Sequence, residues 1–152
     1  MADVSVEVAD PRAAESRALV EQLWEEFGRW YGDTGPCQFV PEDVEGEGCA
    51  FVVARLAGRA VGCGAVRPLE AGVAEVKRMY VEPDARRRGV ARRVLRELER
   101  IARELSYSAV RLETGLKQPE AIRLYEGEGY ARVPCYGAYA SDPMSVCFEK
   151  RL

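Results

Sequence analysis

The sequence predicts a single α/β domain with a mixed (α+β) sheet, in which antiparallel N-terminal strands precede a β-helix-β unit. Three observations predict this class. Residues 50–83 hold three closely spaced strand patterns. Residues 73–115 place a long amphipathic helix between two strands. A length of 152 residues with 47% hydrophobic content suffices for one core, so we expect one domain over residues 1–152.

The N-terminal half predicts a strand, a helix and a meander. Residues 4–8, VSVEV, alternate in polarity like a strand. Asp10-Pro11 then precedes a helical repeat formed by Leu19, Leu23, Phe27, Trp30 and Tyr31, and residues 32–36 form a loop. Residues 49–69 predict two strands joined at Ala57-Gly58, and residues 72–83 a third that stops at Pro83. This clustering favours antiparallel pairing.

The C-terminal half predicts a helix, a strand, a second helix and two short strands. From Arg87 onward a 3.6-residue period connects Val90, Val94, Leu95, Leu98, Ile101, Ala102 and Leu105. Residues 108–115 follow as a buried strand, and such a β-helix-β unit normally has parallel strands with a right-handed crossover. Pro119 opens the next helix, Gly127 and Gly129 end it, and residues 130–136 and 145–152 predict the last strands.

Composition excludes several classes of function. No run approaches about 18 apolar residues, and the N-terminus lacks signal-peptide features, so we expect a cytoplasmic protein without membrane contact. The chain has no histidine, which excludes Ser-His pairs and His-based metal sites, and we expect no metal. Five cysteines, odd in number and without C-x-x-C spacing, favour reduced and mostly buried thiols at Cys37, Cys49, Cys63, Cys135 and Cys147.

The turn from Arg86 to Ala91 is the clearest candidate site. It follows a strand and opens a helix, so unpaired backbone N–H groups gather there at the positive end of the helix dipole. Gly89 lets a diphosphate approach the main chain, and Arg86, Arg88 and Arg92 could add charge-assisted hydrogen bonds. The alternative is a solvated arginine face, which we accept for the helix beyond Arg92, where glutamates alternate with the arginines.

The pattern R-x-x-G-x-A after a strand resembles the GNAT superfamily of acyl-CoA-dependent N-acetyltransferases, whose signature is Q/R-x-x-G-x-G/A between its fourth strand and third helix. A second stretch, QPEAIRLYEGEGY at residues 118–130, resembles the family's N-x-x-A-x-x-L-Y-x-x-x-G-F/Y. The predicted element order agrees along nearly the whole chain. The resemblance implies the GNAT fold with splayed central strands, and acetyl-CoA as cosubstrate.

The resemblance also implies which residues bind acetyl-CoA. In the family the turn amides hold the diphosphate, and pantetheine pairs with the fourth strand, which maps to residues 79–81. A main-chain N–H near Met79 would polarise the thioester carbonyl. Gln118 stands where the family often has asparagine, with its amide on a longer side chain. The expected set is Met79, Tyr80, Val81, Arg86, Arg87, Arg88, Gly89, Val90, Ala91, Arg92 and Gln118.

Two residues are expected to perform the chemistry. Glu75 lies at the offset of a catalytic glutamate in the histone-acetylating branch, so the resemblance makes it the base. It would act through water, because an ordinary carboxyl pKa of about 4.3 is far below about 10.4 for an amine. The alternative is a surface carboxylate paired with Lys77 or Arg78. Tyr125 matches the family tyrosine that protonates or hydrogen-bonds the coenzyme A sulfur, with a core aromatic as the alternative because Ile122 shares its helix face.

The acceptor pocket is expected to combine aromatic rings with arginines. Family members build it from the first helix and its following loop, the fourth strand and the loop between the last two strands. Those segments here contain Trp24, Trp30, Tyr31, Arg78, Tyr136 and Tyr139. Aromatic rings near Arg78 or Arg67 suit an amino-acid-like acceptor that has both an amine and a carboxylate. The alternative for the aromatic residues is the core.

These observations predict an N-acetyltransferase that moves acetyl directly from acetyl-CoA to the primary amine of a small molecule. An acyl-CoA-binding regulator without turnover is a second hypothesis, against which the presence of Glu75 and Tyr125 argues. A nucleic-acid-binding domain is a third, disfavoured by a net charge of −3 and by the glutamates on the arginine-rich helix. The sequence leaves open the acceptor, the acyl length and whether the chain forms a homodimer.

Overall fold

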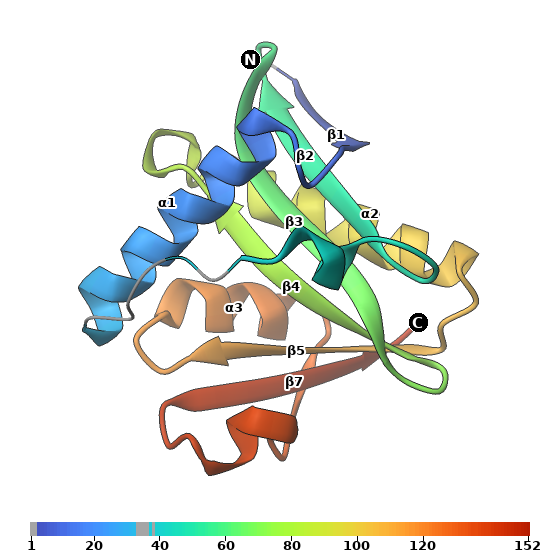
Figure 1. Cartoon of the computed structure of the whole chain (residues 1–152). Coiled ribbons are helices and arrows are strands. Elements are labelled where there is room, and N and C mark those ends of the chain that lie inside the picture. The colour runs from blue at the N-terminus through green and yellow to red at the C-terminus, as the bar shows by residue number, and fades with distance from the viewer. Residues whose placement is uncertain (1–2, 33–36, 38) are drawn as a thin grey trace.

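A seven-stranded mixed sheet runs through the molecule in the order β1-β2-β3-β4-β5-β7-β6 (Figure 1). The computed structural model describes residues 3–32, 37 and 39–152. The strands are β1 (Val4–Val8), β2 (Ala50–Leu56), β3 (Arg59–Glu70), β4 (Val73–Val81), β5 (Ala109–Gly115), β6 (Ala131–Val133) and β7 (Ser145–Arg151). The helices are α1 (Ala14–Tyr31), α2 (Val90–Glu104) and α3 (Pro119–Gly127), with short 3-10 helices η1 (Pro41–Val44), η2 (Pro83–Ala85) and η3 (Gly137–Ser141). The predicted mixed α/β class is confirmed.

The N-terminal half matches the predicted meander. Strands β1 to β4 pair antiparallel in chain order, and positive φ angles at Ala57 and Gly58 make the tight β2–β3 turn. Helix α1 starts at Ala14, later than the Asp-Pro signal, because the carboxylate of Asp10 accepts the backbone N–H of Arg12 and forms a separate turn. The predicted loop at 32–36 falls mostly on residues 33–36, outside the described residues.

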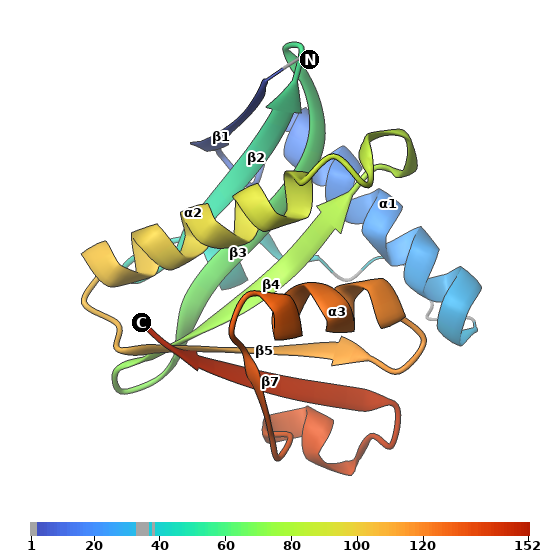
Figure 2. The same ribbon diagram turned by 180° about the vertical axis from the view of Figure 1, so that it is seen from behind.

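The helices cover the two faces of the sheet unequally. Helix α1 lies on one face, and α2 and α3 lie on the other (Figures 1 and 2). The larger core fills the α2/α3 side and includes Val94, Leu98 and Phe148. A smaller core joins Leu19 and other α1 residues to the opposite face. Within the described residues, no helix has the length and apolar character needed to cross a membrane.

A β-bulge interrupts strand β4. Cys63 of β3 pairs with Tyr80, whereas Ala65 pairs with Lys77, so β4 has one extra residue between these pairs. The extra residue is accommodated at Arg78, whose φ of 60° is unusual for a residue with a side chain. Val76 and Val81 therefore both belong to the larger core although five positions separate them.

Strands β4 and β5 separate soon after they meet. Their parallel pairing is limited to Val73 with Ala109, Ala74 with Val110, and Glu75 with Arg111. Beyond these pairs the two strands diverge, with α3 packed beside the opening (Figure 2). Tyr31 of α1 reaches Gly115 at the far end of β5, where a Cβ atom would lie only 1.7 Å from the tyrosine hydroxyl. The expected splaying of the central strands is present.

The expectation of reduced, mostly buried cysteines is wrong. Cys135 and Cys147 form a disulfide, while Cys37 is exposed and Cys49 is half-buried. The physical reason is the β6–β7 pairing, in which Val133 lies opposite Cys147 and brings the two cysteine Cα atoms to 5.1 Å. A spacing of twelve residues does not reveal this pairing in the sequence, because it does not fix the register in which β6 pairs with β7.

Candidate active site

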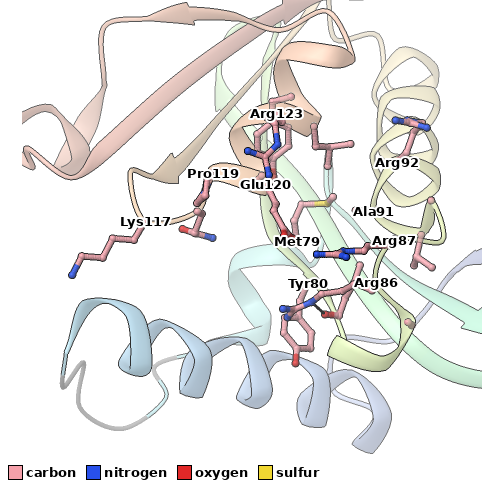
Figure 3. A pocket seen from close by; sticks show the side chains of 18 of the residues that line it. Met79, Tyr80, Arg86, Arg87, Ala91, Arg92, Lys117, Pro119, Glu120 and Arg123 are labelled. Carbon is pink, nitrogen blue, oxygen red and sulfur yellow. Dashed lines mark hydrogen bonds between the residues drawn. The ribbon is translucent and has the colours of Figure 1, made fainter.

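A cleft of about 930 Å³ lies beside the opening between β4 and β5, bordered by the start of α2 and by α3. Its walls contain most of the predicted cofactor residues, namely Met79, Tyr80, Val81, Arg86, Arg87, Gly89, Val90, Ala91, Arg92 and Gln118, together with Tyr125. Figure 3 shows Arg87 from the turn and Arg123 from α3 pointing into the space between the two helices. A single cleft thus joins the two sequence motifs, which lie on different helices.

The turn before α2 exposes its backbone donors to this cleft. Arg87 and Gly89 have φ angles of 64° and 78°, and Gly89 caps the helix without a side-chain hydrogen bond. A Cβ atom at Gly89 would meet no atom within 4 Å, so the main chain faces open space there. Free N–H groups at a helix start, reached past a glycine, fit the diphosphate of acetyl-CoA.

The arginines of the turn have different roles in the structure. Arg86 lines the cleft, but its guanidinium bonds the carboxylate of Glu26 at 2.7 Å and the Val81 carbonyl at 2.9 Å. Arg87 has no ion-pair partner among the described residues, and Arg88 is exposed and does not line the cleft. Arg92 lies 3.4 Å from Glu128. Arg87 is therefore the turn side chain best placed for a phosphate.

The strand side of the cleft offers main-chain groups more than side chains. Tyr80 turns its ring into the smaller core, where its hydroxyl bonds Gln22. Gln118 accepts a hydrogen bond from the Tyr31 hydroxyl at 3.2 Å, and that hydroxyl also accepts the backbone N–H of Lys117. The amide of Gln118 therefore joins α1 to the entrance of α3 rather than pointing freely into the cleft.

Tyr125 lies at the inner end of the cleft. Its ring is 5% exposed and packs against Tyr130 and Phe148, so the core-aromatic alternative describes the ring correctly. The residue also lines the cleft, and its hydroxyl has no hydrogen-bond partner among the described residues. Burial raises the pKa of Tyr125, and the nearby charge of Glu113 adds to the shift. Its hydroxyl is thus a protonated, uncommitted donor.

Glu75 lies on the α1 side of the sheet and does not line the cleft. It is 5% exposed, so the alternative of a surface carboxylate is wrong, although Lys77 is its neighbour at 3.8 Å. The hydroxyl of Tyr136 donates a hydrogen bond to Glu75 at 2.9 Å. The structure therefore places the two predicted catalytic residues on different sides of the opening.

The predicted acceptor residues divide between these two sides. Trp30 lines the cleft, while Tyr31 closes the far end of the opening. Tyr136 and Tyr139 pack edge to face, and Tyr139 accepts a hydrogen bond from Lys77 at 3.0 Å. Arg78 stacks over Phe39 within a small hollow that Trp24 also lines. The buried Nε atoms of Arg67 and Arg78 have no partner in the described part of the chain.

Three residues near the opening do not stand out in the sequence. Lys117 and Arg123 line the cleft, and Glu113 lies where β5 leaves β4. The helical period of α3 places Arg123 on a different face from Ile122 and Tyr125, which predicts that its side chain is exposed to solvent. Only the packing of α3 beside α2 turns that face toward the cleft. Glu113 lies within a segment that reads as a buried strand. An acidic residue within a strand expected to be buried was the available signal, but Arg111 and Thr114 beside it make the signal weak.

No group of three or more potential metal ligands occurs among the residues that the structure describes. The sequence model described as "Acetyltransferase (GNAT) family" matches residues 16–130. An Azospirillum brasilense protein named IAA acetyltransferase is 41% identical over 146 residues, which cover 93% of this chain and 95% of that protein.

Two solved structures extend the comparison. An acyl-CoA N-acyltransferase from Klebsiella pneumoniae has a TM-score of 0.80 at 34% identity, covering 98% of this chain and 97% of its own. A GNAT family acetyltransferase from Elizabethkingia anophelis with acetyl-CoA bound has a TM-score of 0.70 at 12% identity, covering 98% of each chain. The second likeness concerns the fold alone.

Proposed function

The chain belongs to the GNAT family of acetyltransferases, and from this premise we propose that it transfers acetyl from acetyl-CoA directly to the primary amine of a small, amino-acid-like molecule. One observation carries the proposal. A single cleft has uncapped helix amides at Gly89 and an unpartnered phenol at Tyr125. The first group suits a diphosphate and the second suits a sulfur leaving group.

Acetyl-CoA supplies the activated thioester, and residues of this chain hold it in place. The amides of the turn and the side chain of Arg87 bind the diphosphate, with Arg123 facing them across the cleft. The main chain of residues 79–81 is unpaired toward β5 and is available to the pantetheine. A backbone N–H beside Met79 would stabilise negative charge on the thioester oxygen.

Tyr125 interacts with the sulfur atom that leaves the thioester. A thiol has a pKa of about 8.5, whereas the pKa of Tyr125 is raised above the ordinary phenol value of about 10. Complete transfer of the phenol proton to the thiolate is therefore unfavourable. Tyr125 acts by donating a hydrogen bond that strengthens as charge develops on sulfur, and solvent completes the protonation.

The amino-acid-like acceptor is supported by the cations on the α1 side. The guanidinium groups of Arg67 and Arg78 each bury an Nε without a partner among the described residues, on the face where Tyr136 and Tyr139 lie. Both arginines are half-buried, and a guanidinium with a buried donor that has no partner favours a ligand that supplies an acceptor. A carboxylate on the acceptor would satisfy either arginine and direct its amine toward the gap between β4 and β5.

The test is a two-step measurement on the purified chain. Acetyl-CoA should raise the melting temperature, because a ligand that binds only the native state stabilises it. Release of free thiol is then measured with amino acids, their decarboxylated amines, peptides and IAA, the acceptor in the relative's name. Arg78→Gln should weaken the binding of acceptors that carry a carboxylate and leave the binding of the other acceptors unchanged. Arg88→Gln is the control variant.

The outcomes separate the three hypotheses. Thiol release with an amine acceptor supports the acetyltransferase. A thermal shift without turnover on any acceptor supports the acyl-CoA-binding regulator. A shift with RNA and none with acetyl-CoA contradicts the proposal in favour of nucleic-acid binding.

A further inference from the structure

Two carboxylates approach the opening between β4 and β5 from the α1 side. Glu75 belongs to the last β4–β5 pair, opposite Arg111. Glu113 is two residues further along β5, where the strands have separated, and its side chain projects to the same face because strand side chains alternate. The corresponding β4 residue is Lys77. Glu113 therefore lies at the edge of the gap, whereas Glu75 lies within the paired part of the sheet.

Their hydrogen bonds leave the two carboxylates unequally available. Glu75 receives the hydroxyl of Tyr136 on one oxygen, and the ammonium of Lys77 lies 3.8 Å from the other. Glu113 receives only the hydroxyl of Ser145, at 2.7 Å on Oε2. Its Oε1 atom has no partner among the described residues. Glu113 thus keeps one oxygen free for a ligand.

The surroundings of Glu113 include groups from every neighbouring element. Burial raises the pKa of Glu113, the charges of Asp142 and Glu75 raise it further, and Ser145 and Lys77 oppose the shift. The charge of Glu113 in turn raises the pKa values of Tyr31 on α1, Tyr125 on α3 and Tyr136 before η3. Glu113 is therefore electrostatically coupled to tyrosines on both sides of the opening.

Building on the proposed acetyltransferase function, we propose that Glu113 binds the ammonium group of the acceptor and takes its proton, while Glu75 acts as a positioning residue for Tyr136. The acceptor R–NH₃⁺ gives one proton to the Glu113 carboxylate and becomes R–NH₂. Its nitrogen lone pair then forms the bond to the acetyl carbon as the carbon–sulfur bond breaks. The sulfur leaves with its electron pair while Tyr125 donates a hydrogen bond to it, solvent carries one further nitrogen proton to the thiolate, and Glu113 returns its proton to water.

Glu113 suits this role better than Glu75 for a physical reason. An acceptor amine is protonated at neutral pH, so its binding site at the gap needs a carboxylate with one oxygen that is free to accept a hydrogen bond. A carboxyl whose pKa lies above the ordinary value of about 4.3 is also a stronger base toward that amine. Glu75 is already occupied by Tyr136 and Lys77, and its loss would act through the orientation of the tyrosine ring.

The experiment compares Glu113→Gln with Glu75→Gln, because each amide preserves the hydrogen bond from its hydroxyl partner. Phenethylamine serves as a protonated aromatic amine, 2-phenylethanol as its neutral analogue, and binding is measured calorimetrically in the presence of coenzyme A. Glu113→Gln should weaken phenethylamine binding about tenfold or more, the factor for losing a charge-assisted hydrogen bond, and leave 2-phenylethanol unchanged. Glu75→Gln should change the affinities for both probes equally and by only a few-fold.

Turnover gives a second readout. With phenethylamine as acceptor, kcat/KM of Glu113→Gln should fall about 100-fold or more near pH 7 and recover as pH approaches the amine pKa, with partial rescue by Glu113→Asp. Equal phenethylamine binding by wild type and Glu113→Gln, or a pH-dependent defect confined to Glu75→Gln, would overturn the assignment. A wild type without any acetyl-CoA thermal shift contradicts the proposed function instead, so the two failures are distinct.

Discussion

The two sides of the opening between β4 and β5 differ in charge and in how they are held together. The α2/α3 side presents arginines and free helix amides around a wide cleft, with Arg87 unpaired among the described residues. The α1 side presents carboxylates and cations together, beneath a loop fixed by a disulfide: Tyr136 bonds Glu75, Lys77 bonds Tyr139, Ser145 bonds Glu113, and Arg67 and Arg78 lie on the same face. An anionic donor and a cationic amine would therefore each meet the complementary charge.

Because the two sides differ, one gap in the sheet can bring two different substrates together. An excess of cations on the α2/α3 side and mixed charges on the α1 side favour approach of the two substrates from opposite faces, and the reacting atoms would meet where the strands have separated. The ion pair between half-buried Arg86 and buried Glu26 joins the turn before α2 to α1, the helix that also carries Trp30 and Tyr31. The following predictions change one side while the other serves as reference.

The largest expected effect concerns Tyr125. Tyr125→Phe removes the hydroxyl and keeps the packed ring, so kcat should fall by about 100- to 1,000-fold, as for the loss of one preorganised hydrogen-bond donor, while acetyl-CoA affinity changes little. Tyr130→Phe is the matched control, because its hydroxyl bonds Glu99 away from the cleft. Steady-state kinetics and the acetyl-CoA thermal shift measure the two quantities. Full activity of Tyr125→Phe would return this residue to a purely structural role.

Gly89→Val should nearly abolish acetyl-CoA binding, by about 100-fold or more, because the side chain would enter the space that the diphosphate needs. Gly58→Val provides the control, since Gly58 has φ of 80° against 78° for Gly89 and also faces open space. Both variants introduce the same backbone strain, so the difference between their acetyl-CoA affinities measures the effect of the side chain in the cleft. Calorimetry showing equal affinities would refute the diphosphate site.

Cys135→Ser should lower the free energy of unfolding by about 2–4 kcal/mol, because the unfolded chain is no longer constrained by the crosslink. Cys37→Ser, which changes an exposed thiol, should have no effect. Denaturant titration measures both. The acetyl-CoA affinity of Cys135→Ser should persist, since the disulfide belongs to the acceptor side; its loss would contradict the independence of the two sides.

Arg87→Gln should weaken acetyl-CoA binding about five- to tenfold, as expected for one charge-assisted hydrogen bond at a solvent-exposed site. It should also reduce the salt dependence of binding. The adjacent Arg88→Gln should change little, because Arg88 does not line the cleft. The reverse result would show that the side chain of Arg88, and not that of Arg87, meets the phosphates.

The smallest effect is a gain in stability. Because burial raises the pKa of Glu113 in the folded protein, its ionisation opposes folding at any pH above about 4.3, the value for an unfolded chain. Glu113→Gln should therefore raise the melting temperature at pH 7 by about 1–3 °C, and the gain should vanish as pH falls toward 4.3. A variant less stable than wild type at pH 7 would contradict the cost assigned to this charge.

Periodicity predicted the elements because each follows from local sequence. It could not predict contacts between distant segments. Arg86 reads as a phosphate ligand beside Gly89, yet it bonds Glu26, sixty residues earlier on another element. The disulfide of Cys135 depends on the register in which β6 pairs with β7. The polar residue Glu113 stands out only once the separation of β4 from β5 is known.

The bulge at Arg78 sets the phase of strand β4. Side chains along a strand point alternately to its two faces, so one extra residue exchanges the faces of everything that follows. If the strand alternated regularly from Lys77 with Arg78 still present, Tyr80 would turn away from the α1 core and Met79 away from the cleft, whereas deleting Arg78 would remove the bulge and keep both residues on their present faces. Substitutions leave this phase intact. The strand can therefore change its chemistry one side chain at a time, whereas a change of one residue in its length preserves the faces of residues 79–81 only at the bulge.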